Sequence, residues 1–167
     1  MPQNYLVVRQ LFAEYLRWAT SRFGEEYPAV VDPEPMIVHD MDTIEKFLPP
    51  RGFLLIAYVD DFPVGCAAVH GIEARIAELQ RVYVRPSHRR KGIGGALVEE
   101  LIRRVDQTNF EGIRLYSPRF MVESHRIYRS HGFTEISPYE ESEIPEEHRK
   151  YFLFMALKLG KDPNELP

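Results

Sequence analysis

Apolar and polar positions follow helical spacing at the start of this chain. Apolar residues recur at three- and four-residue intervals from Tyr5 to Phe23, which predicts an amphipathic helix that Gly24 ends. The sequence Asp42-Thr43-Ile44-Glu45 resembles a capping box. It predicts a second, short helix that ends at Pro49 and Pro50.

The middle of the chain changes to strand patterns. Two apolar runs, Phe53–Val59 and Val64–Val69, flank the turn sequence Asp60-Asp61-Phe62-Pro63, and this arrangement predicts a β-hairpin. Polar and apolar residues then alternate from Ala77 to Val84, which predicts a third strand. A sheet therefore begins after the predicted N-terminal helices.

Helices and strands alternate in the second half. Apolar residues at four-residue spacing from Ile93 to Val105 predict a strongly amphipathic helix. The later predicted elements are a strand at Gly112–Tyr116, a helix at Met121–His131 with Gly132 at its end, and strands at Phe133–Ile136 and Tyr151–Leu159. This order predicts an α/β fold with a mixed sheet, and the 167 residues fit a single domain over residues 1–167.

Charge and composition narrow the class of protein. The formal net charge of −4 gives no basic surface of the kind that nucleic-acid binding requires. The longest apolar run, Phe53–Val59, is too short to span a bilayer, and no targeting segment is visible, so we expect a soluble cytoplasmic protein. Cys66 lies in an apolar run as a small hydrophobic residue, and the six histidines show no metal-ligand spacing. We therefore expect no metal.

A basic, glycine-bearing loop from Pro86 to Gly95 separates the third strand from the next helix. The first N–H groups of a helix lack partners, the helix dipole is positive there, and glycine lets a phosphate approach the backbone. Arg89, Arg90 and Lys91 add charge, so the loop predicts a phosphate or pyrophosphate site. The P-loop pattern is absent, and Leu97 stands where a dinucleotide fingerprint needs its third glycine.

The loop sequence Arg89-Arg90-Lys91-Gly92-Ile93-Gly94 resembles the [QR]-x-x-G-x-[GA] acetyl-CoA motif of the Gcn5-related N-acetyltransferase (GNAT) superfamily. Val82-Tyr83-Val84-Arg85-Pro86 resembles the family's central strand, and Ile127-Tyr128-Arg129-Ser130-His131-Gly132-Phe133 resembles its L-Y-x-x-x-G-F signature. The resemblance extends from Phe53 to Leu159. It implies a GNAT-like mixed, mostly antiparallel central sheet flanked by helices. The family's first strand is expected to be short or missing, because the first helix begins within the first few residues.

The resemblance also implies a reaction, the transfer of an acetyl group from acetyl-CoA to a primary amine by direct attack on the thioester. Glu78 matches the position of the catalytic glutamate in histone-type members of the family, where it could act directly or through a water, while other members use different bases or ordered water. Tyr128 matches the acid near the thioester sulfur. The residues themselves leave alternatives open. Glu78 could instead face solvent or pair with Arg81, and Tyr128 could be a core aromatic residue.

The resemblance implies that acetyl-CoA contacts the central strand and the loop. The backbones of Val82 and Val84 would contact the acetyl carbonyl and the pantetheine arm, and the N–H groups from Arg90 to Ala96 would contact the pyrophosphate. The full set of expected cofactor-binding residues is Val82, Tyr83, Val84, Arg89, Arg90, Lys91, Gly92, Ile93, Gly94, Gly95 and Ala96.

The acceptor is less well defined. The acidic segment Tyr139–His148 lies between the last two strands, where related enzymes build part of the acceptor wall, and it would favour a cationic small-molecule or peptide amine; a solvated loop is the alternative. A non-catalytic CoA-binding or sensing module is the second hypothesis for function, and a nucleotide-binding protein is the third. The sequence leaves a homodimer open.

Overall fold

The computed structural model describes residues 4–160, with more helix near the start than the sequence pattern predicts. The helices are α1 (Tyr5–Glu26), α2 (Pro33–Asp42), α3 (Ile93–Asp106) and α4 (Val122–Ser130), and the 3-10 helices are η1 (Ile44–Phe47), η2 (Pro86–His88) and η3 (Glu146–Tyr151). The strands are β1 (Gly52–Val59), β2 (Phe62–Gly71), β3 (Ile76–Val84), β4 (Gly112–Pro118), β5 (Thr134–Ile136) and β6 (Phe152–Lys158).

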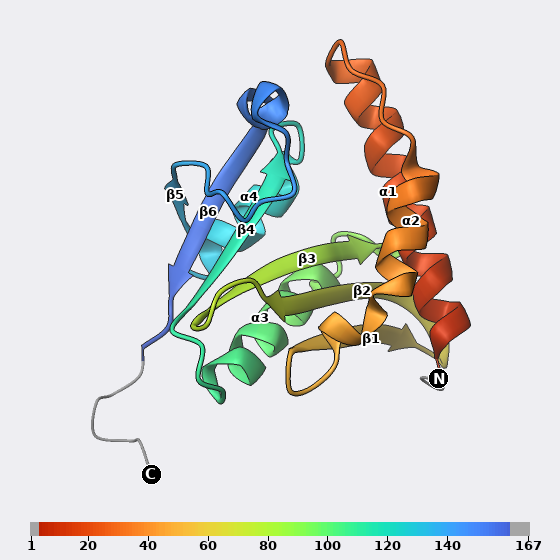
Figure 1. The fold of residues 1–167 in the computed structure, drawn as a ribbon. Coiled ribbons are helices and arrows are strands. Elements are labelled where there is room, and N and C mark those ends of the chain that lie inside the picture. Colours follow the sequence, from red (N-terminus) through yellow and green to blue (C-terminus); the bar gives the residue numbers. More distant parts are fainter. Residues whose placement is uncertain (1–3, 161–167) are drawn as a thin grey trace.

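The six strands form one sheet in the order β1-β2-β3-β4-β6-β5. β3 and β4 run parallel and the other neighbouring pairs are antiparallel, so the predicted mixed, mostly antiparallel sheet is confirmed. α1 and α2 lie over one face, and α3 and α4 pack on the other (Figure 1). Within residues 4–160 no strand precedes α1.

α1 continues two residues past Gly24, so the prediction that this glycine ends the helix is wrong. Arg22 donates hydrogen bonds to Glu25 at 2.9 Å and to Glu26 at 2.7 Å, and these pairs cross the glycine. Side chains three and four residues apart stabilise a helix, which offsets part of the roughly 1 kcal/mol that a helical glycine costs.

The capping-box prediction at Asp42–Glu45 is also wrong. The second helix begins at Pro33, where the Asp32 side chain accepts a hydrogen bond from the Glu34 N–H at 3.0 Å. Thr43 donates its hydroxyl back to the His39 carbonyl at 2.7 Å, so it ends α2 and does not cap a new helix. Residues 44–47 form only the four-residue η1.

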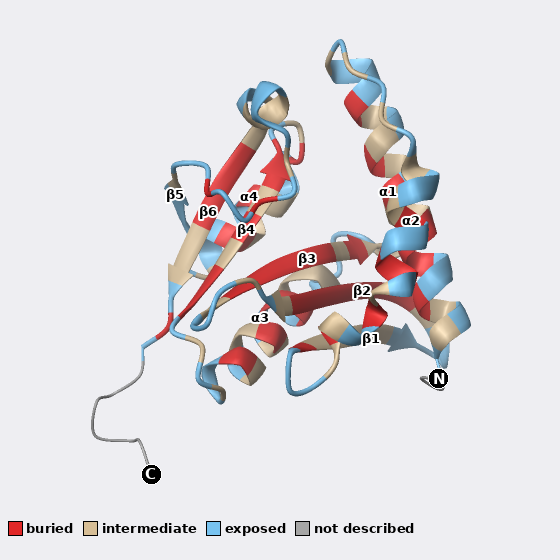
Figure 2. Cartoon of the chain, in the orientation of Figure 1, coloured by how far each residue is buried: buried red, intermediate tan, exposed pale blue. Residues whose placement is uncertain are grey.

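Two apolar cores occupy the two faces of the sheet (Figure 2). Leu97, Leu101 and Val105 of α3 pack against β1–β4 on one face, together with Tyr128 of α4. Leu11 and Phe12 of α1 pack on the other. Among residues 4–160, no helix is long and apolar enough to cross a membrane.

β3 and β4 pair only where both strands begin. The register ends with Glu78 opposite Arg114, and no further pair follows along β3. β4 pairs with β6 over all of Gly112–Pro118. The two strands therefore separate as a V that opens toward α1 (Figure 1). On this side, the backbone of β3 beyond Glu78 has no strand partner.

β3 also contains a bulge at Arg81. Cys66 of β2 pairs with Tyr83 and Ala68 pairs with Gln80, so two residues of β3 oppose one of β2. Arg81 has a φ of 56°, in the left-handed region that non-glycine residues rarely occupy. The extra residue changes which side chains of β3 face which core.

The bulge reverses the alternation of the strand. Ala77 and Leu79 belong to the core on the α3 side before the bulge, and Val82 and Val84 pack against the same core after it. Gln80 and Arg81 therefore both point toward α1 and α2. Two consecutive polar side chains can face the wedge between β3 and β4 only because of this irregularity.

A buried ion pair holds the bulge against α2. The Arg81 guanidinium donates to Asp40 from Nε at 2.5 Å and from Nη2 at 2.9 Å, and the two side chains are only 7% and 1% exposed. This two-pronged geometry is the strong form of the arginine–carboxylate contact. The pair links the middle of β3 to a helix 41 residues earlier.

We predict that Asp40→Ala lowers the free energy of unfolding by about 3–5 kcal/mol, because it leaves the Arg81 charge buried without a partner. Arg17→Gln, which breaks the exposed pair with Glu34, is the control and should cost less than about 1 kcal/mol. Urea unfolding of both variants measures the difference. Equal losses would show that the buried pair does not hold the bulge.

Candidate active site

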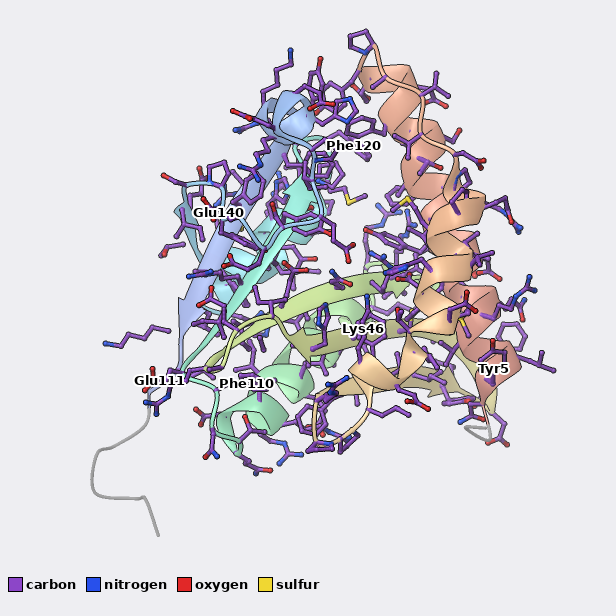
Figure 3. All side chains as sticks on the ribbon, in the orientation of Figure 1. Tyr5, Lys46, Phe110, Glu111, Phe120 and Glu140 are labelled. Carbon is purple, nitrogen blue, oxygen red and sulfur yellow. The ribbon has the colours of Figure 1, made fainter. Side chains whose placement is uncertain are left out.

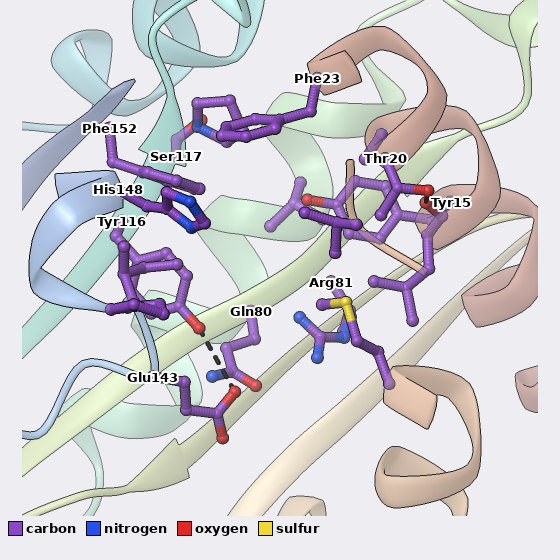
Figure 4. A pocket seen from close by; sticks show the side chains of 18 of the residues that line it. Tyr15, Thr20, Phe23, Gln80, Arg81, Tyr116, Ser117, Glu143, His148 and Phe152 are labelled. Carbon is purple, nitrogen blue, oxygen red and sulfur yellow. Dashed lines mark hydrogen bonds between the residues drawn. The ribbon is translucent and has the colours of Figure 1, made fainter. Parts of the chain in front are cut away.

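A cavity of about 510 Å³ occupies the wedge between β3 and β4 (Figure 4). α1 and the loop before α2 form one side, β3 and β4 form the base, and the segment after β5 forms the other side. Thr20 and Phe23 line the cavity from α1, Gln80 from β3 and Ser117 from β4. Glu143 and His148 line it from the segment after β5. A site of this volume suits the burial of one small molecule.

Aromatic rings join α1 to the β4–β6 half of the sheet across the open end of the wedge. The ring centres of Phe23 and Phe152 are 5.4 Å apart, and Tyr27, directly after α1, stacks on Tyr151 at 4.5 Å. The Tyr27 ring also lies 6.3 Å from that of Phe120, which Figure 3 shows between α1 and the end of β4. Aromatic pairs at such separations stabilise beyond their buried area. We call these five residues the aromatic bridge.

The separated edge of β3 leads from the cavity toward the start of α3. Val82 lines the cavity, while the Tyr83 ring points to the α1 face, 5.9 Å from Tyr15. Arg89 donates from Nε to the Val84 carbonyl at 2.9 Å, and its guanidinium lies 4.8 Å from the centre of the Trp18 ring. Arg89 therefore braces the end of β3 against α1.

The basic loop adopts the backbone that an anion site needs. Arg90 and Gly92 have φ values of 59° and 81°, and α3 starts directly afterwards at Ile93. The first helical hydrogen bond runs from the Ala96 N–H to the Gly92 carbonyl at 3.0 Å. The N–H groups before Ala96 thus have no acceptor within the helix and are free to donate to a diphosphate. The Ala96 N–H already donates to the Gly92 carbonyl.

The exposed side chains and the glycines of the loop also suit the binding of a phosphate group. Arg90 and Lys91 are exposed beside the helix start. A Cβ on Gly94 would lie 3.2 Å from the Ile127 side chain, so this glycine lets α3 approach α4 closely. Gly95, also predicted to bind the cofactor, is half-buried in the first turn of α3.

Glu78 is almost fully buried, with 1% of its surface exposed. One carboxylate oxygen accepts a hydrogen bond from the Tyr139 hydroxyl at 2.7 Å, and the other accepts one from the Gln80 amide. The alternatives that Glu78 faces solvent or pairs with Arg81 are therefore wrong. Burial raises the pKa of Glu78 to about 7, although the hydrogen bonds from Tyr139 and Gln80 act in the opposite direction.

Glu78 lies behind the surface of the cavity, because Gln80 lines the cavity and Glu78 does not. Its partner Tyr139 was not predicted as a site residue. The only signal for it in the sequence is an aromatic residue at the start of the acidic segment.

Tyr128 lies both in the cavity wall and in the core. Its side chain is 7% exposed, and its ring lies 5.9 Å from that of Phe133. Burial raises the pKa of the hydroxyl well above its ordinary value, so Tyr128 keeps its proton at neutral pH. The sequence left two hypotheses for Tyr128, an acid near the thioester and a core aromatic residue. They do not exclude each other, because the side chain belongs both to the core and to the cavity wall.

Glu143 brings the acidic segment into the wall. Its Oε2 accepts a hydrogen bond from the Tyr116 hydroxyl at 3.4 Å, and its other oxygen lies 3.9 Å from Lys46 Nζ. Burial, followed by the charges of Glu78 and Glu143, raises the pKa of Tyr116 well above the ordinary value. The sequence indicated the acidic segment that contains Glu143, but it did not single out this carboxylate and gave no signal for Tyr116 as its partner.

Cys66 is fully buried, as predicted for a small hydrophobic residue, and burial raises the pKa of its thiol. Across residues 4–160, no group of three or more histidine, cysteine, aspartate or glutamate residues is arranged to hold a metal ion.

Comparisons with known proteins identify the family. The model of the acetyltransferase (GNAT) family matches residues 9–133. The chain is 30% identical over 164 residues to an uncharacterized N-acetyltransferase of Schizosaccharomyces pombe, covering 96% of this chain and 92% of the relative. This chain therefore belongs to the acetyltransferase (GNAT) family.

Solved structures share the fold. An acetyltransferase of the GNAT family from Staphylococcus aureus superposes with a TM-score of 0.71 at 19% identity over 96% of both chains. PaiA N-acetyltransferase from Thermoplasma acidophilum, crystallised in complex with coenzyme A, superposes with a TM-score of 0.67 at 17% identity over 93% of both chains.

We predict that Glu78→Gln removes a pH dependence of stability. The folded-state pKa of about 7 exceeds the ordinary value of 4.5, so the stabilisation is complete below pH 4.5 and is lost as the pH rises to about 7. The wild type should lose on the order of 3 kcal/mol relative to the variant across this window. Urea unfolding at pH 4.5, 6 and 8 measures this, and a pH-independent difference would contradict it.

Proposed function

We propose that this protein is an N-acetyltransferase that transfers the acetyl group of acetyl-CoA to a primary amine by direct attack on the thioester. One observation carries the proposal: the open edge of β3 leads from the cavity to Val84, and a Cβ on Gly94 in the first turn of α3 would lie only 3.8 Å from the Val84 side chain. Family membership supports it, as does the coenzyme A bound by the PaiA relative. We further propose that residues 1–167 form one catalytic domain.

Each part of this surface has a role in the proposal. The N–H groups from Arg90 to Gly95 and the charges of Arg90 and Lys91 bind the diphosphate. The pantetheine arm lies along the open edge of β3 near Val84. The acetyl group reaches the cavity between Val82 and Tyr128, which both line it.

The proposed reaction forms a C–N bond and breaks the C–S bond. The ammonium first loses a proton, and the free amine attacks the acetyl carbon to give a tetrahedral oxyanion. When this collapses, the sulfur leaves as a thiolate and takes the proton of Tyr128, while the nitrogen loses its second proton. Tyr128 then recovers one proton, and the other passes to solvent. Burial keeps the hydroxyl of Tyr128 protonated at neutral pH, so a proton is available there for the departing thiolate.

Glu78 is the proposed acceptor of the first proton. Its pKa of about 7 is near the value at which a general base works best at neutral pH. Since Glu78 lies behind the cavity surface and its oxygens are engaged by Tyr139 and Gln80, the proton would reach it through a water molecule, not by direct contact.

Calorimetric titration with acetyl-CoA tests the cofactor, with ATP and NAD as controls. We expect selective micromolar binding, and its absence from folded protein would refute the proposed function. Consumption of the thioester in the presence of amines then separates an enzyme from a module that only binds or senses CoA.

Gly92→Val should weaken acetyl-CoA binding by about tenfold or more, because a β-branched residue is strained at a φ of 81° and its side chain stands where the phosphates approach. Gly160→Val, at a position with open space around it, is the control and should bind like the wild type. Unaltered affinity in Gly92→Val would refute the assignment of the loop.

Tyr128→Phe should reduce kcat by about 10²–10⁴-fold while acetyl-CoA affinity remains nearly intact, since only the proton donor is lost. Tyr58→Phe, which changes an exposed tyrosine of β1, is the matched control. Steady-state kinetics and calorimetry measure the two quantities separately. Unchanged turnover would remove Tyr128 from the mechanism.

A further inference from the structure

The two ends of the cavity differ in chemistry. Gln80, Glu143 and the hydroxyl of Tyr116 gather in the lower part of the view in Figure 4, and Phe23 and Phe152 lie in the upper part. The upper part also holds His148 and Ser117, so a ligand that fills the cavity meets a carboxylate, an amide and a phenol at one end and mainly, but not only, apolar rings at the other.

Gln80 presents a buried acceptor without a donor. Its amide nitrogen donates to the Glu78 carboxylate, which fixes the orientation of the amide. Its Oε1 is buried and has no hydrogen-bond partner among residues 4–160, and the residue is only 5% exposed. A buried carbonyl oxygen without a donor costs free energy, so a ligand that donates a hydrogen bond here is favoured.

The charge at this end is negative. Glu143 lines the cavity and Glu78 lies directly behind Gln80, while the positive charge of Arg81 is already paired with Asp40. Lys46 approaches Glu143 only to 3.9 Å. Arg81 and Asp40 neutralise each other, and Glu78, with a pKa of about 7, carries only part of a charge, so Glu143 is the carboxylate that a cation on the ligand would meet.

A primary ammonium matches these groups. It carries three N–H donors and no acceptor. The Glu143 carboxylate, the Gln80 carbonyl oxygen and the oxygen of the Tyr116 hydroxyl offer acceptors on the same side of the cavity.

The remaining wall favours an apolar body. Leu16, Phe23 and Phe152 present hydrocarbon and aromatic surface. The Thr20 hydroxyl already donates to the Leu16 carbonyl at 2.8 Å, and Ser117 is bonded to His125 at 3.1 Å. A peptide chain or a carboxylate on the ligand would therefore bring further polar groups against a mainly apolar wall.

We propose that the acceptor is a small lipophilic primary amine. Glu143 and Gln80 bind its ammonium group, and Phe23 and Phe152 of the aromatic bridge contact its hydrocarbon or aromatic body. This inference rests on the proposed acetyltransferase function and narrows its substrate class.

The test uses 2-phenylethylamine as the probe and compares it with L-phenylalanine, which adds a carboxylate, and with the tripeptide Ala-Ala-Ala. With acetyl-CoA saturating, kcat/KM should be highest for 2-phenylethylamine. Glu143→Gln should lower it by about tenfold or more, mainly through KM, because a charge-assisted hydrogen bond is lost. Glu147→Gln, an exposed carboxylate of the same segment outside the cavity lining, is the matched control.

The outcomes separate this inference from the proposed function. If acetyl-CoA binds but the tripeptide or phenylalanine is the better acceptor, the proposed substrate class is wrong and the acetyltransferase function stands. The same conclusion follows if Glu143→Gln behaves like Glu147→Gln. If acetyl-CoA does not bind, the proposed function fails. Calorimetric titration of 2-phenylethylamine into the wild type and into Glu143→Gln then still decides whether the cavity binds the ammonium, and absent or equal binding overturns that assignment.

Discussion

The parting of β3 and β4 is the constraint on which the rest of this structure depends. β4 pairs along its whole length with β6 on one edge, but on its other edge it pairs with β3 only as far as Glu78. The wedge that results creates the cavity and leaves one edge of β3 without a strand partner. The same edge ends at the glycine-rich start of α3. One interruption of the sheet thus opens the cavity and frees the edge of β3 that leads to the proposed anion site.

The bulge at Arg81 determines which side chains this wedge receives. Without the extra residue, strict alternation would place Arg81 on the α3 face, among apolar residues. With it, Gln80 and Arg81 both face α1 and α2, and Asp40 neutralises the arginine. A strained backbone position near a candidate site is thereby held by an ion pair from a distant helix.

Local signals sufficed for much of the fold. The hairpin, the basic loop and the helix after it were predictable because turn residues and hydrophobic periods act over a few positions. The start of α2 also had a local signal, Asp32-Pro33, which was outweighed by the false capping box at Asp42–Glu45. The bulge and the contacts between Glu78 and Tyr139, 61 residues apart, depend on tertiary packing and leave no pattern in the sequence.

The aromatic bridge closes the wedge with rings in place of backbone hydrogen bonds. Phe23 and Phe152, whose ring centres lie 5.4 Å apart, line the cavity together with Val82, near which the acetyl group is proposed to sit. Exchange of one ring for a smaller or larger side chain changes the space available to an acceptor and leaves the backbone of β3 in place. A single substitution in the aromatic bridge would therefore alter which acceptors the proposed enzyme takes and leave untouched the edge of β3 on which acetyl-CoA is proposed to lie.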